Sequence, residues 1–356
     1  MIEIDGNYGE GGGQILRTAL SLSCLFKKPF RIFNIRKGRK KPGLMAQHLT
    51  CVRAAQLISD AEVEGDALGS KELYFSPQKI KGGDIFFDIG TAGSTSLVLQ
   101  TIIPALISGN EKATVVLKGG THVPFSPSFH YIAEVFAPFL KRLAIEIEVS
   151  IDPYGFYPVG GGKVVAAIIP AKKITSITII KRGKVLSLKG YSAVANLPLS
   201  IAERQRAALL DKIDSQIKEQ TFPLDIELLN VRSVGQGTFV FLKSESEESI
   251  AGFTALGERG KKAEAVGKEA AEGFISYYQT DAALDEHLAD QIVLYLSMCR
   301  EKSVFTTSCI TQHLMTNLWA IRQFYEFSYS VDGKIGESGT VRVGNDTKRY
   351  ENLCRE

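Results

Sequence analysis

The chain has 356 residues, of which 44% are hydrophobic and 23% are charged, and its formal net charge at pH 7 is +3. This composition excludes a disordered chain and allows a large buried core, so we expect one large domain with a smaller one beside it. The net charge is too small to indicate a nucleic-acid-binding protein, so the clustering of basic residues has to decide that question.

The cysteines are widely spaced and form no C-x-x-C pair, which argues against a disulfide framework and a structural zinc site. They are Cys24, Cys51, Cys299, Cys309 and Cys354. No signal-peptide pattern opens the chain, and no uncharged apolar run reaches the roughly 18 residues of a membrane helix. We therefore expect a cytoplasmic protein with no membrane partner.

Three pairs of apolar helices recur along the chain, and each pair is closed by a strand with a period of two. The predicted helices are 14–26 and 42–58, 94–108 and 126–143, and 284–298 and 313–325. The closing strands are 61–64, 145–149 and 327–331, with further strands at 84–89 and 113–118. This layout predicts an α/β (α+β) fold of three repeated units of paired helices on a small sheet, in a pseudo-threefold arrangement.

One segment breaks this rhythm, because it is richer in Lys, Glu and Ser and is expected to form strand, helix, strand, strand, helix, with a long charged helix at 202–220. We predict a small inserted α/β domain at 181–278. The catalytic domain of three repeats is then discontinuous, at 1–180 and 279–346, and a C-terminal tail follows at 347–356.

A glycine-rich turn at 9–17 leads into the first helix, and such a turn can bind an anion through its backbone N–H groups. It matches neither the P-loop nor the dinucleotide-binding pattern, and a tight turn that caps the helix is an equal alternative. Glu10 and Arg17 flank this turn. Their carboxylate and guanidinium could hold a metal ion and a phosphate.

Residues 27–43 contain eight basic residues and no acid, and they precede the second helix. A solvated run of charge is one interpretation. The other is a phosphate site, because the guanidiniums of Arg36 and Arg39 suit a bidentate grip and the Gln47 amide lies one turn into the helix.

Two further loops open the equivalent helices, at 119–127 and 307–313. If the three junctions converge, Arg36, Arg39, Pro127 and His313 line a central cleft. His313 could be an ordinary core or capping histidine, but a neutral imidazole can also attack phosphorus directly. Cys309 is a competing nucleophile, and no base for it is evident in the nearby sequence.

Residues 285–291 begin the first helix of the third unit, and an acidic helix cap explains them without any function. His287 and Asp290 nevertheless share one face of that helix, and Gln291 lies beside it. Gln100 stands in the middle of an apolar helix, where its carboxamide needs a partner. A nucleotide base could be that partner.

Taken together, these motifs resemble the RNA 3′-terminal phosphate cyclase family. The resemblance runs in unbroken order from Asp5 to about Val331 and is weakest in the inserted segment. One departure is Tyr154, which precedes Gly155 where the family leads us to expect Arg or His. The residues that carry the resemblance are 9–17, 35–39, 42–44, 47–49, 91–94, 155–162 and 287–291.

The resemblance implies an enzyme of the ligase class that uses ATP to convert an RNA 3′-terminal phosphate into a 2′,3′-cyclic phosphate. It implies a covalent histidine–AMP and then an RNA-adenylate, with release of pyrophosphate and then AMP, and it implies a divalent cation, Mg²⁺ or Mn²⁺. By position, the nucleophile is His313 and the metal-binding residue is Glu10. The implied adenylate pocket comprises Gln100, Pro127, His287, Leu288, Ala289, Asp290 and Gln291, and the implied phosphate and RNA contacts are Arg17, Arg36, Arg39 and Gln47.

Three alternatives are weighed against this interpretation. A non-catalytic cyclase-like protein of ribosome assembly would be expected to lack the nucleophilic histidine and the adenylate pocket. An enolpyruvyl transferase would share the repeated architecture but has no role for Glu10 or His313. A lysine-adenylating ligase is disfavoured because no K-x-D-G motif occurs: Ser330 stands where the lysine would be. The oligomeric state is left open between monomer and homodimer.

Overall fold

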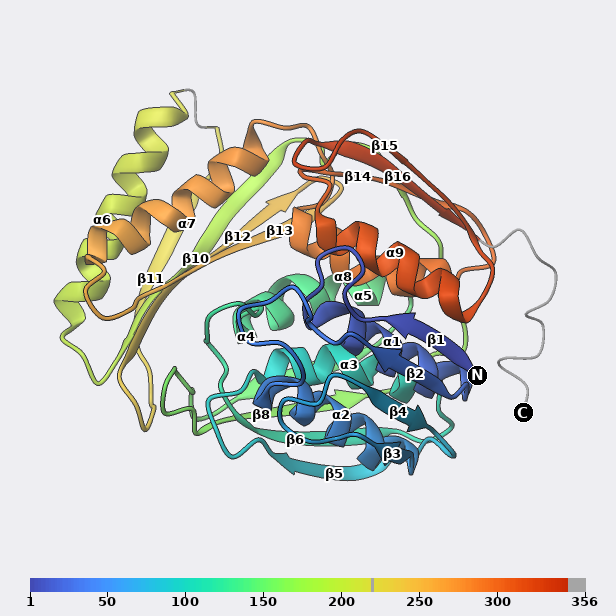
Figure 1. The fold of residues 1–356 in the computed structure, drawn as a ribbon. Coiled ribbons are helices and arrows are strands. Elements are labelled where there is room, and N and C mark those ends of the chain that lie inside the picture. The colour runs from blue at the N-terminus through green and yellow to red at the C-terminus, as the bar shows by residue number, and fades with distance from the viewer. Residues whose placement is uncertain (219–220, 345–356) are drawn as a thin grey trace.

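A computed structural model describes residues 1–218 and 221–344 of the chain. The described residues form four sheets of four strands each, with helices packed on them (Figure 1). The predicted tail 347–356, Cys354 and the last two residues of the predicted helix 202–220 lie outside this part of the chain.

The first unit comprises β1 (Ile2–Asp5), α1 (Gln14–Phe26), β2 (Phe30–Phe33), α2 (Ala46–Ser59), β3 (Glu62–Glu64) and β4 (Leu73–Ser76). Its sheet has the order β1-β2-β4-β3, in which the first pair is parallel and the other two are antiparallel. The helix predicted to start at residue 42 starts at Ala46, because Gly43 has a φ of +81° and Pro42 precedes it in the loop.

The second unit comprises β5 (Gly83–Asp88), α3 (Thr95–Ile107), β6 (Ala113–Gly119), β7 (Ile147–Ile151) and β8 (Gly162–Ile168). The helix predicted at 126–143 is not continuous: α4 (Phe129–Tyr131), the π-helical turn η1 (Ile132–Phe136) and α5 (Ala137–Arg142) replace it. Pro138 explains the irregularity, since it has no N–H to donate to the carbonyl of Glu134.

The third unit comprises β9 (Thr178–Ile179), α8 (Glu286–Ser297), β14 (Ser303–Thr307), α9 (Gln312–Phe324), β15 (Ser328–Asp332) and β16 (Gly339–Gly344). The second and third units repeat the first sheet, with strand orders β5-β6-β8-β7 and β9-β14-β16-β15 and the same sequence of parallel and antiparallel pairs. The predicted fold of three repeated units is confirmed.

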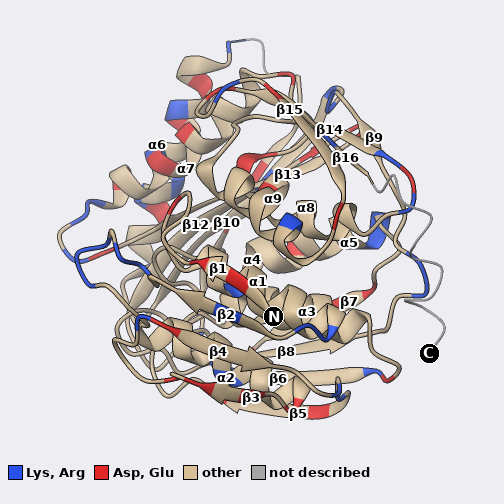
Figure 2. Cartoon of the chain, turned by 45° about the vertical axis from the view of Figure 1, so that its right-hand side comes forward, with Lys and Arg blue, Asp and Glu red and all other residues tan. Residues whose placement is uncertain are grey.

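The remaining elements lie between β9 and α8, inside the third unit. They are β10 (Val185–Ala195), α6 (Leu199–Gln216), β11 (Leu224–Asn230), β12 (Gly237–Ser246), β13 (Ile250–Leu256) and α7 (Ala263–Tyr278). β13 is one strand more than the sequence predicted, because its burial does not alternate. We propose that 181–278 is an inserted domain. Its two helices carry interleaved acidic and basic residues (Figure 2), which pair across the helices as Arg204 with Glu264 at 3.5 Å and Lys212 with Glu272 at 3.0 Å.

The helices of the three units meet in the middle of the molecule, with their sheets on the outside (Figure 1). α1 packs against α2, α3 and α9, and α8 packs against α9. Leu20, Val98, Ile292 and Leu318, one from each of four helices, are fully buried in one shared core. This core fixes the positions of the loops that open the helices. No helix in the described residues is both long enough and apolar enough to cross a membrane.

Candidate functional site

His313 lies in the first turn of α9, and the residue that caps this helix holds it in place. The hydroxyl oxygen of Thr311 accepts a hydrogen bond from the backbone N–H of Leu314 at 2.9 Å. The same hydroxyl donates to the carboxylate of Asp290 on α8 at 2.5 Å. The start of α9 is therefore fixed both to its own backbone and to the neighbouring helix.

The glycine-rich turn after β1 brings Glu10 to His313. The Nδ1 atom of His313 lies 3.4 Å from Oε2 of Glu10. The backbone N–H of Glu10 donates to the hydroxyl of Thr316 at 3.3 Å, one turn along α9. Gly9 allows this approach, because its φ is +61° and a Cβ atom there would lie 2.4 Å from the Thr316 hydroxyl oxygen.

Arg39 contacts the other side of Glu10. Its Nη2 atom donates to the Glu10 carbonyl oxygen at 2.8 Å and to Oε1 of the carboxylate. The loop after β2 thereby reaches α9 through Glu10. The structure thus brings together three predicted site residues, Glu10, Arg39 and His313, that are separated by up to 303 positions in the sequence.

The site has an excess of positive charge. Burial lowers the pKa of Arg17, while the charge of Glu10 opposes this. Burial and then the charge of Arg39 lower the pKa of Arg36. Three guanidiniums therefore lie in the field of one carboxylate, which leaves this site suited to a phosphate or another anion.

The electrostatics of the site favour a neutral imidazole. Burial is the main cause that lowers the pKa of His313, and Arg17, His287 and Arg39 lower it further, while Glu10 opposes them. At neutral pH the side chain therefore retains a nitrogen lone pair. Burial, followed by the charge and hydrogen bond of Glu286, raises the pKa of Cys309 and keeps it a thiol, which makes it the weaker nucleophile.

The stretch 287–291 begins α8 and divides into exposed and buried residues. His287 is exposed and lies beside Tyr131 with 6.2 Å between the ring centroids. The Tyr131 hydroxyl donates to Asp285 at 2.7 Å. The side chains of Leu288 and Ala289 are fully buried in the core, so only their backbone could face a ligand.

Several buried polar atoms lack a hydrogen-bond partner in the described residues. Among them are Nε2 of Gln100 on α3 and Oε1 of Gln291 on α8, whereas Nδ1 of His313 makes no hydrogen bond but lies beside the Glu10 carboxylate. Buried polar groups in proteins are almost always paired, so these atoms indicate a place for a polar ligand or water. The Gln100 carboxamide thus lacks the partner that the sequence led us to expect it to need.

Three other predicted site residues have different surroundings. Gln47 binds the backbone of Ser94, accepting from its N–H at 2.5 Å and donating to its carbonyl at 3.4 Å. Arg36 donates to the carbonyl oxygens of Lys41 at 2.6 Å and Gly43 at 3.2 Å within its own loop. Pro127 is half-buried and directly precedes the residue that caps α4.

Tyr154, the departure from the family pattern, lies in an aromatic cluster between the second unit and β12. Its ring is 5.4 Å from that of His122, and its hydroxyl is 3.3 Å from Nε2 of His130. No contact links it to Glu10 or His313 within the described residues, so the structure gives it a packing role.

Sequence reasoning missed the polar network that joins α1, α8 and α9. The Asn317 carboxamide accepts from Thr18 at 2.7 Å and from Gln14 at 3.1 Å, and it donates to the Asp290 carbonyl oxygen at 2.8 Å. Buried polar residues on apolar helices were the available signal, but the pairing partners are far apart in the sequence.

Glu10 is the carboxylate at this site that could contact a metal ion. No group of three or more His, Cys, Asp or Glu side chains suited to a metal occurs in the part of the chain that the structure describes. A single carboxylate nevertheless suits Mg²⁺ that is bound mainly through the phosphates of a nucleotide. The residues present therefore fit a metal that arrives with its substrate.

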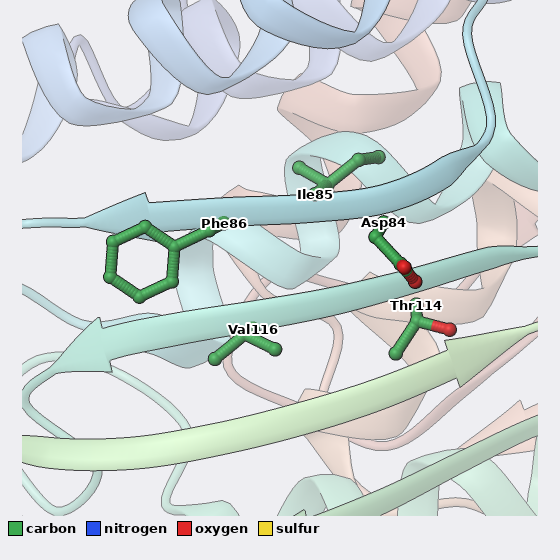
Figure 3. Close-up of a pocket in the computed structure, with 5 residues that line it drawn as sticks. All are labelled: Asp84, Ile85, Phe86, Thr114 and Val116. Carbon is green, nitrogen blue, oxygen red and sulfur yellow. The ribbon is translucent and has the colours of Figure 1, made fainter.

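Two surface depressions lie away from His313. One, of about 120 Å³, is lined by Asp84, Ile85, Phe86, Thr114 and Val116 on the exposed face of β5 and β6 (Figure 3). The other, of about 330 Å³, lies beside the basic loop and is lined by Asn34, Ile35, Lys37, Pro42 and Lys71. The first depression has Asp84 beside Thr114 and is otherwise apolar, and neither depression includes Glu10, Arg39 or His313, so the loop-and-helix site remains the candidate.

Comparisons with known proteins agree with the resemblance. The model of the RNA 3′-terminal phosphate cyclase family matches residues 8–331. Proteins named RNA 3′-terminal phosphate cyclase are similar over nearly the whole chain. The protein from Sulfolobus acidocaldarius is 46% identical over 336 residues, covering 94% of this chain and 97% of that protein. The protein from Saccharolobus solfataricus is 44% identical over 340 residues (94% and 97%), and that from Methylococcus capsulatus is 42% identical over 351 residues (96% and 96%).

Among solved structures, the enolpyruvyl transferase NikO from Streptomyces tendae aligns with a TM-score of 0.34 at 9% identity. The alignment covers 96% of this chain and 47% of that chain, so this chain spans about half the length of NikO. A likeness this distant has no bearing on function.

Proposed function

Because the chain belongs to the RNA 3′-terminal phosphate cyclase family, we propose that it is a ligase-class enzyme that uses ATP to convert an RNA 3′-terminal phosphate into a 2′,3′-cyclic phosphate. One observation carries the proposal: His313 lies at a helix start, 3.4 Å from Glu10, where burial and the charges of Arg17, His287 and Arg39 lower its pKa. Such a site can hold a polyphosphate beside a nitrogen nucleophile.

In the first step, Nε2 of His313 attacks the α-phosphorus of ATP. A nitrogen–phosphorus bond forms, and the bond from the α-phosphorus to its bridging oxygen breaks, so that pyrophosphate leaves with the electron pair. The assignment of Nε2 follows from the position of Nδ1, which faces Glu10. Nδ1 is buried and makes no hydrogen bond to that carboxylate, so we place the attacking lone pair on Nε2, and the nearby charge of Glu10 would stabilise the positive charge on the ring of the adduct.

In the second step, an oxygen of the RNA 3′-phosphate attacks the same phosphorus and the nitrogen–phosphorus bond breaks, which returns His313 to its neutral form. In the third step, the 2′-hydroxyl attacks the RNA phosphate and AMP leaves, while the hydroxyl proton passes to solvent. Arg17, Arg36 and Arg39 would hold the phosphates in both steps, because guanidiniums neutralise negative charge on phosphate oxygens. Gln47 would act on the RNA end only indirectly, through the backbone of Ser94.

We assign the adenylate pocket to residues 287–291 together with Gln100 and Pro127. The unpaired amide atoms of Gln100 and Gln291 could bind the nucleotide, and exposed His287 could contact it with its ring. The backbone N–H groups of Leu288 and Ala289 already donate to Asp285, and the Asp290 carbonyl accepts from Asn317, so these three residues would shape the pocket without hydrogen bonds to the nucleotide. A divalent cation, Mg²⁺ or Mn²⁺, held by Glu10 would neutralise charge on the phosphates. The expected cytoplasmic location and the choice between monomer and homodimer stay predictions.

The test is covalent labelling with ATP that carries the label on the α-phosphate, together with a divalent metal. Wild type is expected to acquire an acid-labile label, as a phosphorus–nitrogen bond requires, and His313→Ala is expected to acquire none. Gln323→Ala, at the far end of the same helix, is the matched control and should be labelled like wild type. Equal labelling of wild type and His313→Ala would refute the assignment.

A second assay separates the cyclase from the non-catalytic alternative. An RNA with a 3′-terminal phosphate should become resistant to phosphatase when incubated with the wild-type protein and ATP. A protein that is not labelled and leaves the RNA end unchanged would instead be the cyclase-like assembly protein. Labelling without any change in the RNA end would indicate a different acceptor.

A further inference from the structure

Tyr8 and Trp319 form a stacked aromatic pair at the edge of the site. Their ring centroids are 3.9 Å apart and their planes differ by 14°. Trp319 packs against the core from α9 and is half-buried, whereas Tyr8 in the turn after β1 is 43% exposed. The stacked pair therefore presents aromatic surface to solvent on a firm support.

Both members of the stacked pair are close in sequence to a residue of the candidate site. Glu10 follows Tyr8 by two residues, a chain length of at most about 7 Å. Trp319 follows His313 by six residues on the same helix, a rise of about 9 Å. The contact between Glu10 and Thr316 joins these two segments between the aromatic pair and His313. Tyr8 is therefore within reach of the last nucleotides of a chain whose 3′ end is bound at His313.

The basic loop borders the same turn. The side-chain oxygen of Asn7 accepts a hydrogen bond from the backbone N–H of Gly38 at 2.9 Å. Lys37, Lys40 and Lys41 are exposed in that loop. Positive charge along one edge and an aromatic face beside it is the combination by which proteins bind single-stranded nucleic acid, with phosphates on the cations and a base on the ring.

The turn that carries Tyr8 does not need the aromatic ring of Tyr8 to be held in place. Backbone and side-chain hydrogen bonds already fix this turn: Asn7 N–H to Asp5 at 3.0 Å, Gly11 N–H to the Tyr8 carbonyl at 3.1 Å, and Glu10 N–H to Thr316 at 3.3 Å. None of these involves the Tyr8 side chain. The ring is thus available for a ligand.

We propose that Tyr8, supported by Trp319, is the stacking platform for one base of the last two nucleotides of the RNA substrate. The proposal rests on the proposed function for the identity of the substrate. Stacking on an aromatic ring accepts any base, because every base has a π-face. The platform positions the RNA end without selecting its sequence.

The test measures the affinity of the full-length protein for a short RNA with a 3′-phosphate, by anisotropy of a dye on the RNA 5′ end. Tyr8→Ala should weaken binding about 5- to 100-fold, while Tyr8→Phe keeps the ring and should bind like wild type. Removing the bases of the last two nucleotides should weaken wild-type binding by a similar factor and should have little further effect on Tyr8→Ala. Phe86→Ala, which removes an exposed aromatic ring from the outer face of β5 (Figure 3), is the matched control.

Trp319 gives a second measurement, since it is the sole tryptophan of the chain and its emission should change when this RNA binds. Equal affinity of wild type for intact and abasic RNA would overturn the proposal, even if Tyr8→Ala failed to fold. If ATP labels the protein normally but neither Tyr8→Ala nor removal of the bases changes the affinity for RNA, the proposed function stands and the platform is overturned. If the affinity for RNA depends on the bases and on Tyr8 but the protein acquires no label from ATP, the platform stands and the proposed function is overturned.

Discussion

Gln47 offers the sharpest test of how the loops are positioned, because its hydrogen bonds go to the protein backbone and not to the phosphate site in which the sequence placed it. Its carboxamide makes two hydrogen bonds to the backbone of Ser94, which is 3% exposed and caps α3, and also donates to the sulfur of Cys51 at 3.8 Å. Gln47→Ala leaves that buried N–H without a partner, which costs about 1–3 kcal/mol of unfolding free energy. Gln47→Glu can still accept from the N–H but cannot donate to the carbonyl, so its loss should be smaller.

The assay is urea unfolding of the three proteins, combined with the KM for RNA measured at a temperature where all of them are folded. Gln56→Ala is the matched control, since Gln56 lies on the same helix and donates a single hydrogen bond of 3.2 Å to the Ala61 carbonyl. It should cost about 1 kcal/mol. Unchanged stability of Gln47→Ala together with a higher KM for RNA would show that the amide acts on the substrate directly, and the reasoning from Ser94 would be wrong.

Two further predictions concern stability. Burial and the charges of Arg17 and Arg36 lower the pKa of His48 to about 3, so the unfolded chain binds a proton below pH 6.5 that the folded chain does not. The free energy of unfolding should therefore fall by up to about 2 kcal/mol between pH 6.5 and 5, and His48→Gln should remove this fall in urea titrations. An equal dependence of unfolding free energy on pH in wild type and His48→Gln would contradict the prediction. Asn317→Ala should cost about 2–3 kcal/mol, because it leaves Thr18 and the Asp290 carbonyl without their partner. Thermal unfolding measures this, and a change below 0.5 kcal/mol, roughly the effect of an ordinary surface substitution, would contradict it.

Periodicity was sufficient to predict the helices with the strongest apolar faces. The helix predicted at 14–26 has the observed bounds of α1, and that predicted at 313–325 differs from α9 by one residue at each end. It failed where a local feature interrupts the pattern, as Pro138 does at the π-helical turn and as Gly43 does before α2. The repeated strand order could not be derived at all, because pairing between strands is not encoded in the spacing of apolar residues.

The candidate site divides in a similar way. The sequence predicts as site residues those that are unusual in their own segment, such as Gln100 on an apolar helix and the arginines of the basic loop. It does not predict the partners that fix their positions, because Glu10 and His313, or Tyr8 and Trp319, are about 300 positions apart. Contacts of this kind depend on the packing of α1 against α9 and leave no mark in the local sequence.

The repeat is consistent with our proposal that one histidine serves as nucleophile in a fold with three equivalent helix starts. Each unit ends its second strand in a loop that opens a helix, and the positive end of a helix favours a phosphate there. The first unit uses this place for arginines, and in the third the loop is short enough to put His313 in the first turn, behind the cap at Thr311. A lysine or arginine side chain at that position would bind the phosphate but could not attack its phosphorus. In the proposed mechanism, the neutral imidazole, whose pKa the first unit's arginines help to lower, attacks the phosphorus of the phosphate that those arginines would hold.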